Sequence, residues 1–320
     1  MTTDPPEPKP RRKWHFYKWL VLLITAIFAY GTWKAYAFRS AFKQAEALGW
    51  RVNYTKPLEL IREDWKNAFK TPTWFDGVTW MLVPSGEELE KHRAMIQQLN
   101  PKSLSIANSQ TLRDLSALKG HTRLKLLYIE SASSLTNLDA LQNLTALENI
   151  DIPDAQSLTN VDGLKNLLAL KRIRLTNATK LTNVEALKNL PAVVYLELYY
   201  CTGLTNVDVL KNHKELQTVS LIECTGLTNV DGLKNLPDLG NVWLYGSTGI
   251  TDESIEALKA TLPNTNVFTD VPRLLPKPSE PNTTFEARDT DGQPVNTDTP
   301  PLAPKPIKPP PTNDESSPRL

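Results

Sequence analysis

The chain has 320 residues, 40% of them hydrophobic, and its 36 lysines and arginines nearly balance 35 aspartates and glutamates. This balance gives no overall attraction to nucleic acid, so we expect no nucleic-acid partner. Two cysteines and four histidines exclude a disulfide scaffold and a cysteine-rich zinc site, and we expect no metal or cofactor. Of the 25 prolines, four lie in the first ten residues and thirteen in 272–320. The two ends therefore differ in kind from the middle.

The amino end combines a basic tail with an apolar run. Residues 1–18 are proline-rich, carry a net charge of +3 and are expected to be cytoplasmic. No charge occurs from Trp19 to Trp33, and aromatic side chains cluster at both ends of that run. A helix from Tyr17 to Tyr36 would measure about 28 Å, close to the roughly 30 Å of bilayer hydrocarbon. Because aromatic rings prefer membrane interfaces, we predict a transmembrane helix over 19–36.

A cleaved signal peptide is the main alternative, and a buried helix is the other. Ala35, Tyr36 and Ala37 match the small-residue pattern of a cleavage site, but Lys34 and the bulky Trp33 crowd it. Lysine and arginine are denser before the apolar run than after it, which favours a cytoplasmic amino end. We therefore expect a single-pass membrane protein whose carboxyl bulk is exported, in the periplasm or outside the cell.

Residues 37–77 are predicted to form a juxtamembrane helical stalk. One helix is expected over 40–48, where Gly49 would end it. A second helix fits 57–70, because proline stands in its first turn and apolar residues recur along one face. We expect the apolar stripes of this region to pack against the next domain. A membrane-surface helix is the alternative.

Residues 78–100 are predicted to cap the domain that follows. The segment 78–83 is rich in apolar and β-branched residues, which predicts a strand. Ser85 followed by Glu88 matches a capping box, in which each side chain satisfies a backbone group of the first helical turn. We expect that helix to run to about Leu99.

From residue 101 the chain repeats with a period of 23 residues. Leu-Thr-Asn begins at residues 135, 158, 181, 204 and 227, and Ile-Thr-Asp at 250 continues the series. With Leu147 as position 1, the apolar positions are 1, 4, 6, 12, 15, 18 and 21. Positions 4 and 6 have the period of a strand, and positions 12 to 21 have the period of a 3₁₀ or tight helical return. One unit cannot bury its own apolar side, whereas stacked units can.

The sequence therefore predicts an α/β solenoid over 101–272, with seven repeats and one parallel strand from each. Thr251 begins a helix whose residues Ile255, Leu258 and Leu262 would face inward. Such a helix would cover the apolar side of the last coil, and repeat arrays need a terminal cap of this kind to be soluble.

The pattern LxxLxLxx(A/C)xxLTNVxxLKNLP resembles bacterial leucine-rich repeats of the internalin-like type. This resemblance covers about residues 101–263. It implies a curved solenoid whose strands line a concave face used for protein recognition. The chain departs from the pattern in its 23-residue unit, in small residues where that type usually has Asn at position 9, and in lacking an LPxTG-type sorting signal at its end. Adhesion and host invasion are therefore not implied.

Several recurrent residues invite a structural rather than a chemical interpretation. Position 9 holds alanine, serine, and the two cysteines Cys201 and Cys224, which we expect to be small inward side chains. A disulfide between the two is geometrically conceivable at strand spacing. Asn at position 14 is expected to bond backbone groups of adjacent coils. Acidic residues at position 16 and lysines at position 19 are expected to be solvated turns rather than a calcium or lipid site.

The predicted binding site lies on the concave face. Side chains at positions 3, 5 and 7 alternate with the buried positions 4 and 6, so they point away from the core. Tyrosine, tryptophan and arginine dominate protein interfaces, and ordinary strand propensity is the competing explanation for them here. The predicted partner-binding residues are Tyr128, Arg172, Arg174, Tyr195, Glu197, Tyr199, Trp243 and Tyr245.

The spacing of nucleophiles, bases and carboxylates assembles no catalytic motif, so we expect no enzyme activity. Residues 273–320 are proline-rich and poor in apolar mass, which predicts a disordered tail. The predicted function is passive binding of another protein by a membrane-anchored solenoid. The alternatives are an envelope scaffold without a discrete ligand and a glycan-binding module, since aromatic rings also stack on sugars.

Overall fold

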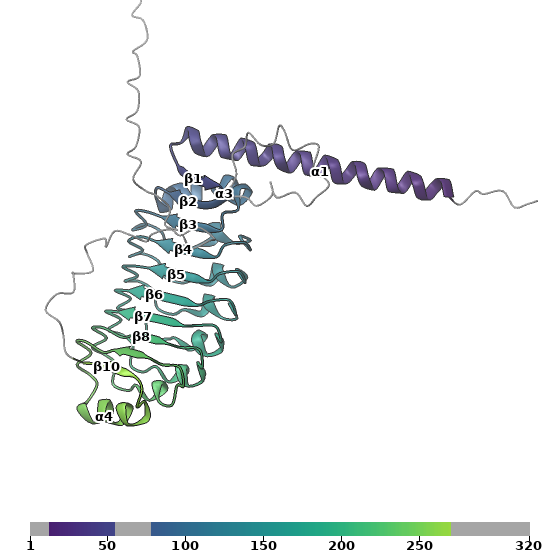
Figure 1. Ribbon diagram of the computed structural model, residues 1–320. Coiled ribbons are helices and arrows are strands. Elements are labelled where there is room, and N and C mark those ends of the chain that lie inside the picture. Colours follow the sequence, from purple (N-terminus) through teal and green to yellow (C-terminus); the bar gives the residue numbers. More distant parts are fainter. Residues whose placement is uncertain (1–12, 55–77, 270–320) are drawn as a thin grey trace, which may run out of the picture. The chain divides into compact units, whose positions relative to one another are not determined.

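A computed structural model describes residues 13–54 and 78–269, and a single sheet organises most of them (Figure 1). In the described residues the sheet has ten strands, ordered β1 to β10 as in the chain. The strands are β1 Arg51–Tyr54, β2 Val78–Val83, β3 Ser103–Ile106, β4 Leu126–Ile129, β5 Asn149–Ile152, β6 Arg172–Thr176, β7 Tyr195–Tyr199, β8 Thr218–Ser220, β9 Asn241–Trp243 and β10 Asn266–Phe268.

The strands β2 to β10 pair in parallel, and from β3 to β9 each partner lies one repeat further along the chain. Ile150 of β5 pairs with Ile173 of β6, for example, and Ile173 pairs with Leu196 of β7. Because every repeat has the same length, each coil places its strand in the same register as the strand before it. The predicted solenoid with one parallel strand per repeat is confirmed. Only β1 runs antiparallel to its neighbour in the described sheet.

Short 3₁₀ helices return the chain from each of the strands β3 to β8 to the next strand, as the three-residue apolar period predicted. They are η4 Ser116–Leu118, η5 Asp139–Leu141, η6 Asp162–Leu164, η7 Glu185–Asn189, η8 Asp208–Asn212 and η9 Asp231–Leu233. The predicted role of Asn at position 14 was wrong. Asn160 Oδ1 accepts a hydrogen bond from the backbone N–H of Asp162 at 3.1 Å, and Asn137, Asn183, Asn206 and Asn229 repeat the contact. The side-chain amide therefore caps its own turn, by bonding the backbone two residues further along the chain rather than a backbone group of an adjacent coil.

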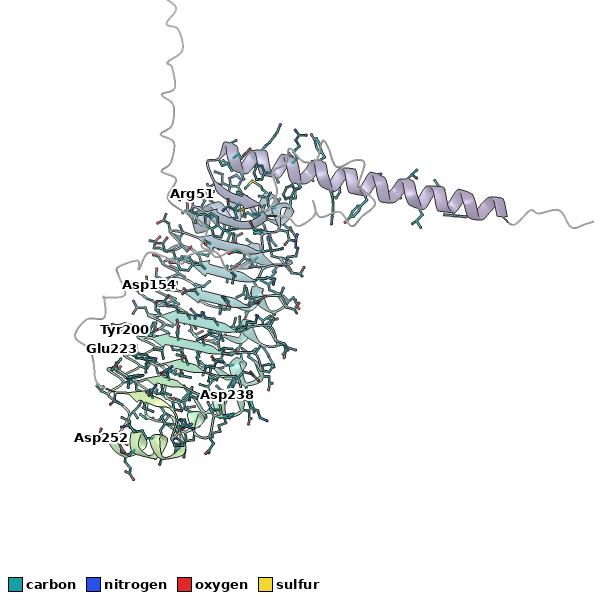
Figure 2. The ribbon with its side chains drawn as sticks, in the orientation of Figure 1. Arg51, Asp154, Tyr200, Glu223, Asp238 and Asp252 are labelled. Atoms are coloured by element: carbon teal, nitrogen blue, oxygen red, sulfur yellow. The ribbon has the colours of Figure 1, made fainter. Side chains whose placement is uncertain are left out.

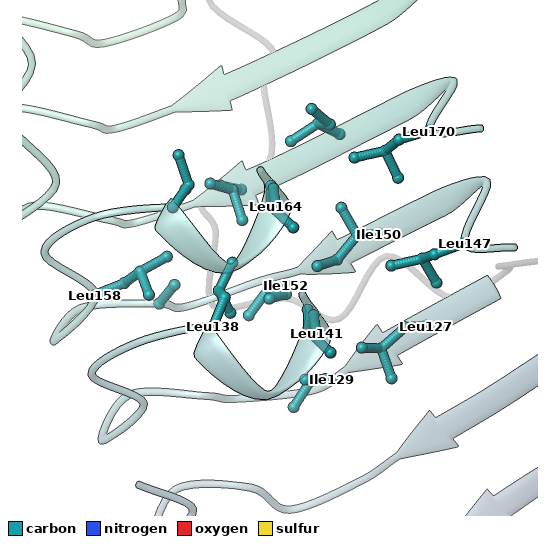
Figure 3. Close-up of a cluster of buried hydrophobic side chains, with 14 of the residues drawn as sticks. Leu127, Ile129, Leu138, Leu141, Leu147, Ile150, Ile152, Leu158, Leu164 and Leu170 are labelled. Atoms are coloured by element: carbon teal, nitrogen blue, oxygen red, sulfur yellow. The ribbon is translucent and has the colours of Figure 1, made fainter. Parts of the chain in front are cut away.

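The core lies between the strands and the returns (Figure 3). Leu147, Ile150, Ile152, Leu158 and Leu164 of one repeat are all fully buried. Figure 3 shows Leu141 and Leu164 in equivalent places of neighbouring coils. The position 9 residues are also buried, as predicted: Ala132, Ala155, Ala178, Cys201, Cys224 and Ser247. A small side chain suits this position because the backbone turns sharply just before it, at residues with positive φ.

The amino side of the sheet is covered by helices. Helix α1 spans Lys13–Ala47, and α2 Gly86–Lys91 and α3 Arg93–Leu99 follow β2. Ala41, Phe42 and Ala45 in the last turns of α1 are buried in the same core as the solenoid, and α1 contacts α3 and β1. The helical prediction over 40–48 is confirmed, and Gly49 follows with φ of 71°. The predicted helix over 57–70 lies outside the described residues.

The capping box at Ser85 is present, since its hydroxyl accepts a hydrogen bond from the backbone N–H of Glu88 at 3.2 Å. The predicted strand over 78–83 is also confirmed as β2. The expected single helix to Leu99 is divided at His92, whose ring packs edge-on against Trp50 with 5.4 Å between centroids. The aromatic contact ties this cap to the residue just before β1.

Helix α1 begins at Lys13, well before the last turns that pack into the core. Several large apolar side chains along its first part are exposed: Trp19, Leu22, Leu23, Tyr30, Trp33 and Tyr36. Among the described residues, no helix is both long enough and apolar enough to cross a membrane. The transmembrane helix expected over 19–36 therefore stays a prediction.

The carboxyl side ends in helix α4, Asp252–Thr261, as the sequence predicted. Thr251 caps it, because its hydroxyl accepts a hydrogen bond from the backbone N–H of Ser254 at 3.2 Å. Leu258 is fully buried and Ile255 packs against the core. The strand β10 follows the helix and pairs with β9, an element that the sequence analysis did not predict.

His213 makes the core sensitive to pH. It is buried at position 21, which is leucine in the neighbouring coils, and its Nε2 lies 2.8 Å from the carbonyl oxygen of Leu187. Burial lowers the pKa of His213 below 6.5. Below pH 6.5 the unfolded chain binds a proton at this histidine that the folded chain does not bind, so stability is lost as the pH falls. We expect His213→Leu to gain stability relative to wild type as pH falls from 7 to 5, measured by urea unfolding. A constant difference would contradict this.

Candidate protein-binding face

The side chains at positions 3, 5 and 7 form the outer sheet face, the face predicted to be concave. They point away from the core, whose residues at positions 4 and 6 are buried. The strand register arranges them in columns across the sheet, and the side chains appear as sticks in Figure 2. The central column contains Tyr128, Asp151, Arg174, Glu197, Ser220 and Trp243, and the column beside it contains Leu126, Asn149, Arg172, Tyr195, Thr218 and Asn241.

Three charged side chains occupy the middle of the central column. An Nη atom of Arg174 lies 3.6 Å from Asp151 Oδ2, and its Nε lies 3.5 Å from Glu197 Oε2. Both separations are long for charge-assisted hydrogen bonds, which are usually below 3 Å. The Arg174 Nε is buried without a hydrogen-bond partner. One guanidinium therefore lies between two carboxylates and saturates neither of them.

Both arginines of strand β6 also face aromatic rings. The guanidinium carbon of Arg172 is 4.6 Å from the centroid of the Tyr195 ring, and that of Arg174 is 5.7 Å from the Tyr199 ring. Such cation–π contacts are worth about 0.5–1 kcal/mol at exposed sites. They hold the arginine side chains over the tyrosines of the next coil and so fix part of the face before any partner arrives.

Asp151 is the most constrained charge on this face. Only 9% of the residue is exposed, and burial raises the pKa of its carboxyl to about 6. The nearby Glu197 raises that pKa further, while Arg174 and Arg172 oppose the shift. Burial likewise raises the pKa of Tyr128 to about 12, with a contribution from Glu130. The negative charges here are therefore incompletely compensated.

Aromatic side chains gather at the carboxyl end of the face. The rings of Trp243 and Phe268 stack with centroids 4.2 Å apart and planes 18° apart. Tyr245 lies 5.7 Å from Trp243 between centroids. Between these rings and Glu197 stands Ser220, a small residue that is almost fully buried. Its hydroxyl lies close to the Tyr199 phenol, yet no partner meets hydrogen-bond geometry.

Residues in the left-handed conformation follow the strands at position 8 and bound one side of the face. Tyr200 and Glu223 have φ of 56° and 57°, and Gly246 has 66°. At Gly246 a Cβ would approach the Glu223 carboxyl carbon to 2.5 Å, so any larger residue would have to displace that side chain. Figure 2 labels Asp154, Tyr200 and Glu223 along this side of the solenoid. The sharp turns end the strands at a common edge.

All eight predicted binding residues occupy the outward positions 3, 5 and 7. Seven of them lie on strands β4, β6, β7 and β9, and Tyr245 lies two residues after β9. Five strand spacings separate Tyr128 from Trp243, about 24 Å. The sequence analysis missed Asp151 and Phe268 as site residues. Asp151 could have been found from its shared position with Arg174 and Glu197. Phe268 could not, because helix α4 breaks the 23-residue period before it.

The other candidate chemical groups do not join this face. Cys201 and Cys224 are free and buried, the role expected for position 9. His121 and His213 are buried at position 21, each with a ring nitrogen near a backbone carbonyl. Within the described part of the chain, no group of three or more histidine, cysteine, aspartate or glutamate side chains could hold a metal ion.

Comparison with known proteins bears on the fold alone. No protein-family model matches the chain, and no curated protein matches it. The leucine-rich-repeat domain of the type III effector XopL is 16% identical, with a TM-score of 0.43 over 75% of this chain and 93% of that one. An internalin (inlF) from Listeria monocytogenes is 19% identical, with a TM-score of 0.19 over 58% of this chain and 82% of that one.

A leucine-rich-repeat protein from T. pallidum is 12% identical, with a TM-score of 0.23 over 61% of this chain and 81% of that one. The parallel strands, the 3₁₀ returns and the leucine core of this chain identify its fold independently of these likenesses. The fold is a leucine-rich-repeat solenoid. Its repeats are 23 residues long, and its outer sheet face is rich in aromatic and charged side chains.

Proposed function

We propose that this leucine-rich-repeat protein is a non-catalytic binding protein whose outer sheet face recognises another protein. The observation that carries the proposal is the register of the outer sheet face, which places Arg174 on β6, Tyr195 and Tyr199 on the adjacent β7, and Trp243 two strands further on β9. Aromatic and arginine side chains bury large areas with little loss of rotamer freedom. Parallel strands hold them rigidly, so little ordering cost is left for binding.

We further propose that residues 19–36 of α1 anchor the chain in a membrane, with the amino end cytoplasmic and the repeats exported. This draws on the uncharged run from Trp19 to Trp33, on the aromatic residues at its ends, and on the exposure of Trp19, Leu22 and Trp33 along the helix. Large apolar side chains left in water are unfavourable, and lipid would cover them.

The double variant Tyr195→Ala/Trp243→Ala tests the binding proposal. We expect it to weaken the complex with a captured partner by at least ~2 kcal/mol, because both side chains would be anchors in the interface. The full chain in native membranes, with a photocrosslinker near Tyr195, would capture that partner. Binding of the purified pair is then measured by calorimetry. The matched control is Leu168→Ala, which removes an exposed side chain outside the outer sheet face.

Unchanged affinity in the double variant would discard the face as the binding site. Failure to crosslink any protein would instead favour the envelope scaffold, which needs no discrete ligand. Extraction at alkaline pH tests the anchor separately. We expect the full chain to stay with the membrane pellet and a variant with Leu22→Lys and Leu23→Lys to be released, since charges within a span are costly.

A further inference from the structure

We propose that the centre of the outer sheet face receives an arginine or lysine side chain of the partner protein, between Asp151 and Glu197. This inference rests on the proposed binding function and adds the chemistry of the ligand. It concerns the central column, where two carboxylates share one guanidinium through separations of 3.6 and 3.5 Å.

The balance of charge decides between a basic and an acidic ligand. Three carboxylates stand on the outer sheet face over β4 to β7, those of Glu130, Asp151 and Glu197, against the two arginines of β6. Both arginines already face tyrosine rings, and Arg174 also faces both carboxylates of its column. An incoming cation would complete the neutralisation, whereas an incoming carboxylate would add a fourth negative charge to a partly buried cluster.

The surroundings of the column favour a side chain with both charge and an apolar stem. Tyr128 and Tyr199 flank the carboxylates, and the rings of Trp243 and Tyr245 stand two coils beyond Glu197. Arginine in particular stacks on aromatic faces while donating hydrogen bonds to carboxylates. Ser220, the neighbour of Glu197 in this column, is small, and its buried hydroxyl has no partner of good geometry.

The charged or titratable groups that face Asp151 come from three strands; the arginines lower its pKa and Glu197 raises it. From β6 these are Arg172 and Arg174, from β7 Glu197, and from β4 Tyr128. The pKa of Asp151 is about 6 in the free protein. A bound cation would favour the ionised carboxyl, so protonation and binding compete. Binding should therefore weaken by about tenfold as pH falls from 7.5 to 5.0, if the cation lowers that pKa by about two units.

Two nine-residue peptides of glycine and serine test the proposal, one carrying three arginines and the other three glutamates at the same positions. Each bears a neutral dye, and fluorescence anisotropy with the full-length protein in detergent gives the affinity at low ionic strength. We expect the arginine peptide to bind at least tenfold more tightly than the glutamate peptide. Asp151→Asn/Glu197→Gln should remove this preference and its dependence on pH.

The matched control is Asp162→Asn/Glu185→Gln, which removes the same two charges from exposed returns and should change nothing. Equal binding of both peptides, no binding of either, or a preference that survives in Asp151→Asn/Glu197→Gln would overturn the inference. A native partner that loses affinity on Tyr195→Ala/Trp243→Ala but not on Asp151→Asn/Glu197→Gln would overturn it as well, and would leave the proposed function standing.

Discussion

Leu164→Ala is expected to lower the free energy of unfolding by roughly 2–5 kcal/mol. Leu164 ends the 3₁₀ return η6 and is completely buried. Truncation removes apolar contacts and leaves a cavity between coils that are held at fixed strand spacing and cannot close around it. Leu164 packs in the middle of the array, so the loss affects the coil interfaces on both sides. Urea unfolding followed by circular dichroism gives the value directly.

The chain supplies a matched control four residues away. Leu168 is 58% exposed, so Leu168→Ala removes the same atoms from a site that is already largely in water. We expect a change within about 0.5 kcal/mol. Similar losses in the two variants would contradict the assignment of inward and outward positions on the returns. Since that assignment defines the core, its failure would also remove the basis for the outer sheet face.

The repeat made most of the fold predictable from sequence. Two independent series with one period, Leu-Thr-Asn and the apolar pair at positions 4 and 6, specify both the returns and the strands. Equal spacing then determines the register, because a shift of one residue would turn a strand's buried side chains outward. The same register predicted which side chains share the outer sheet face, including Arg174 and Tyr195.

Elements outside the period were not predictable in this way. The strands β1 and β10 are only four and three residues long, and both owe their existence to a neighbouring strand rather than to a pattern of their own. The stack of Phe268 on Trp243 follows from β10. The role of Asn160 was mistaken because the choice between capping its own turn and bridging coils depends on backbone geometry that composition does not carry.

The properties of Asp151 likewise came from packing rather than from its residue type. Nothing in the alternation of β5 distinguishes this aspartate from a solvated one. Its burial depends on the coils stacked on either side, which place Tyr128 of β4 and Arg174 of β6 next to it. The central charged column is therefore a product of the array and not of any single repeat.

Asp151→Asn is expected to stabilise the fold at neutral pH, and by more as the pH rises. The folded pKa of about 6 lies above the ordinary aspartate value of 3.8, so between these values the folded chain binds a proton that the unfolded chain has released. Stability is therefore lost as pH rises through this window, up to about 3 kcal/mol in total. Asparagine carries no such cost. The advantage of Asp151→Asn should grow by about 2 kcal/mol between pH 4.5 and 7.

Urea unfolding of Asp151→Asn and wild type across this range measures the difference, in which other titrating groups cancel. Asp162→Asn, at an exposed return, is the matched control for the loss of one aspartate. A variant that is less stable than wild type at pH 7, or a difference that is flat with pH, would show that Arg174 fully compensates the buried carboxylate. If instead the variant is more stable and also loses the arginine peptide, the charge is kept at a cost in stability for the sake of binding. That combination is typical of functional residues, for which stability and activity make opposite demands.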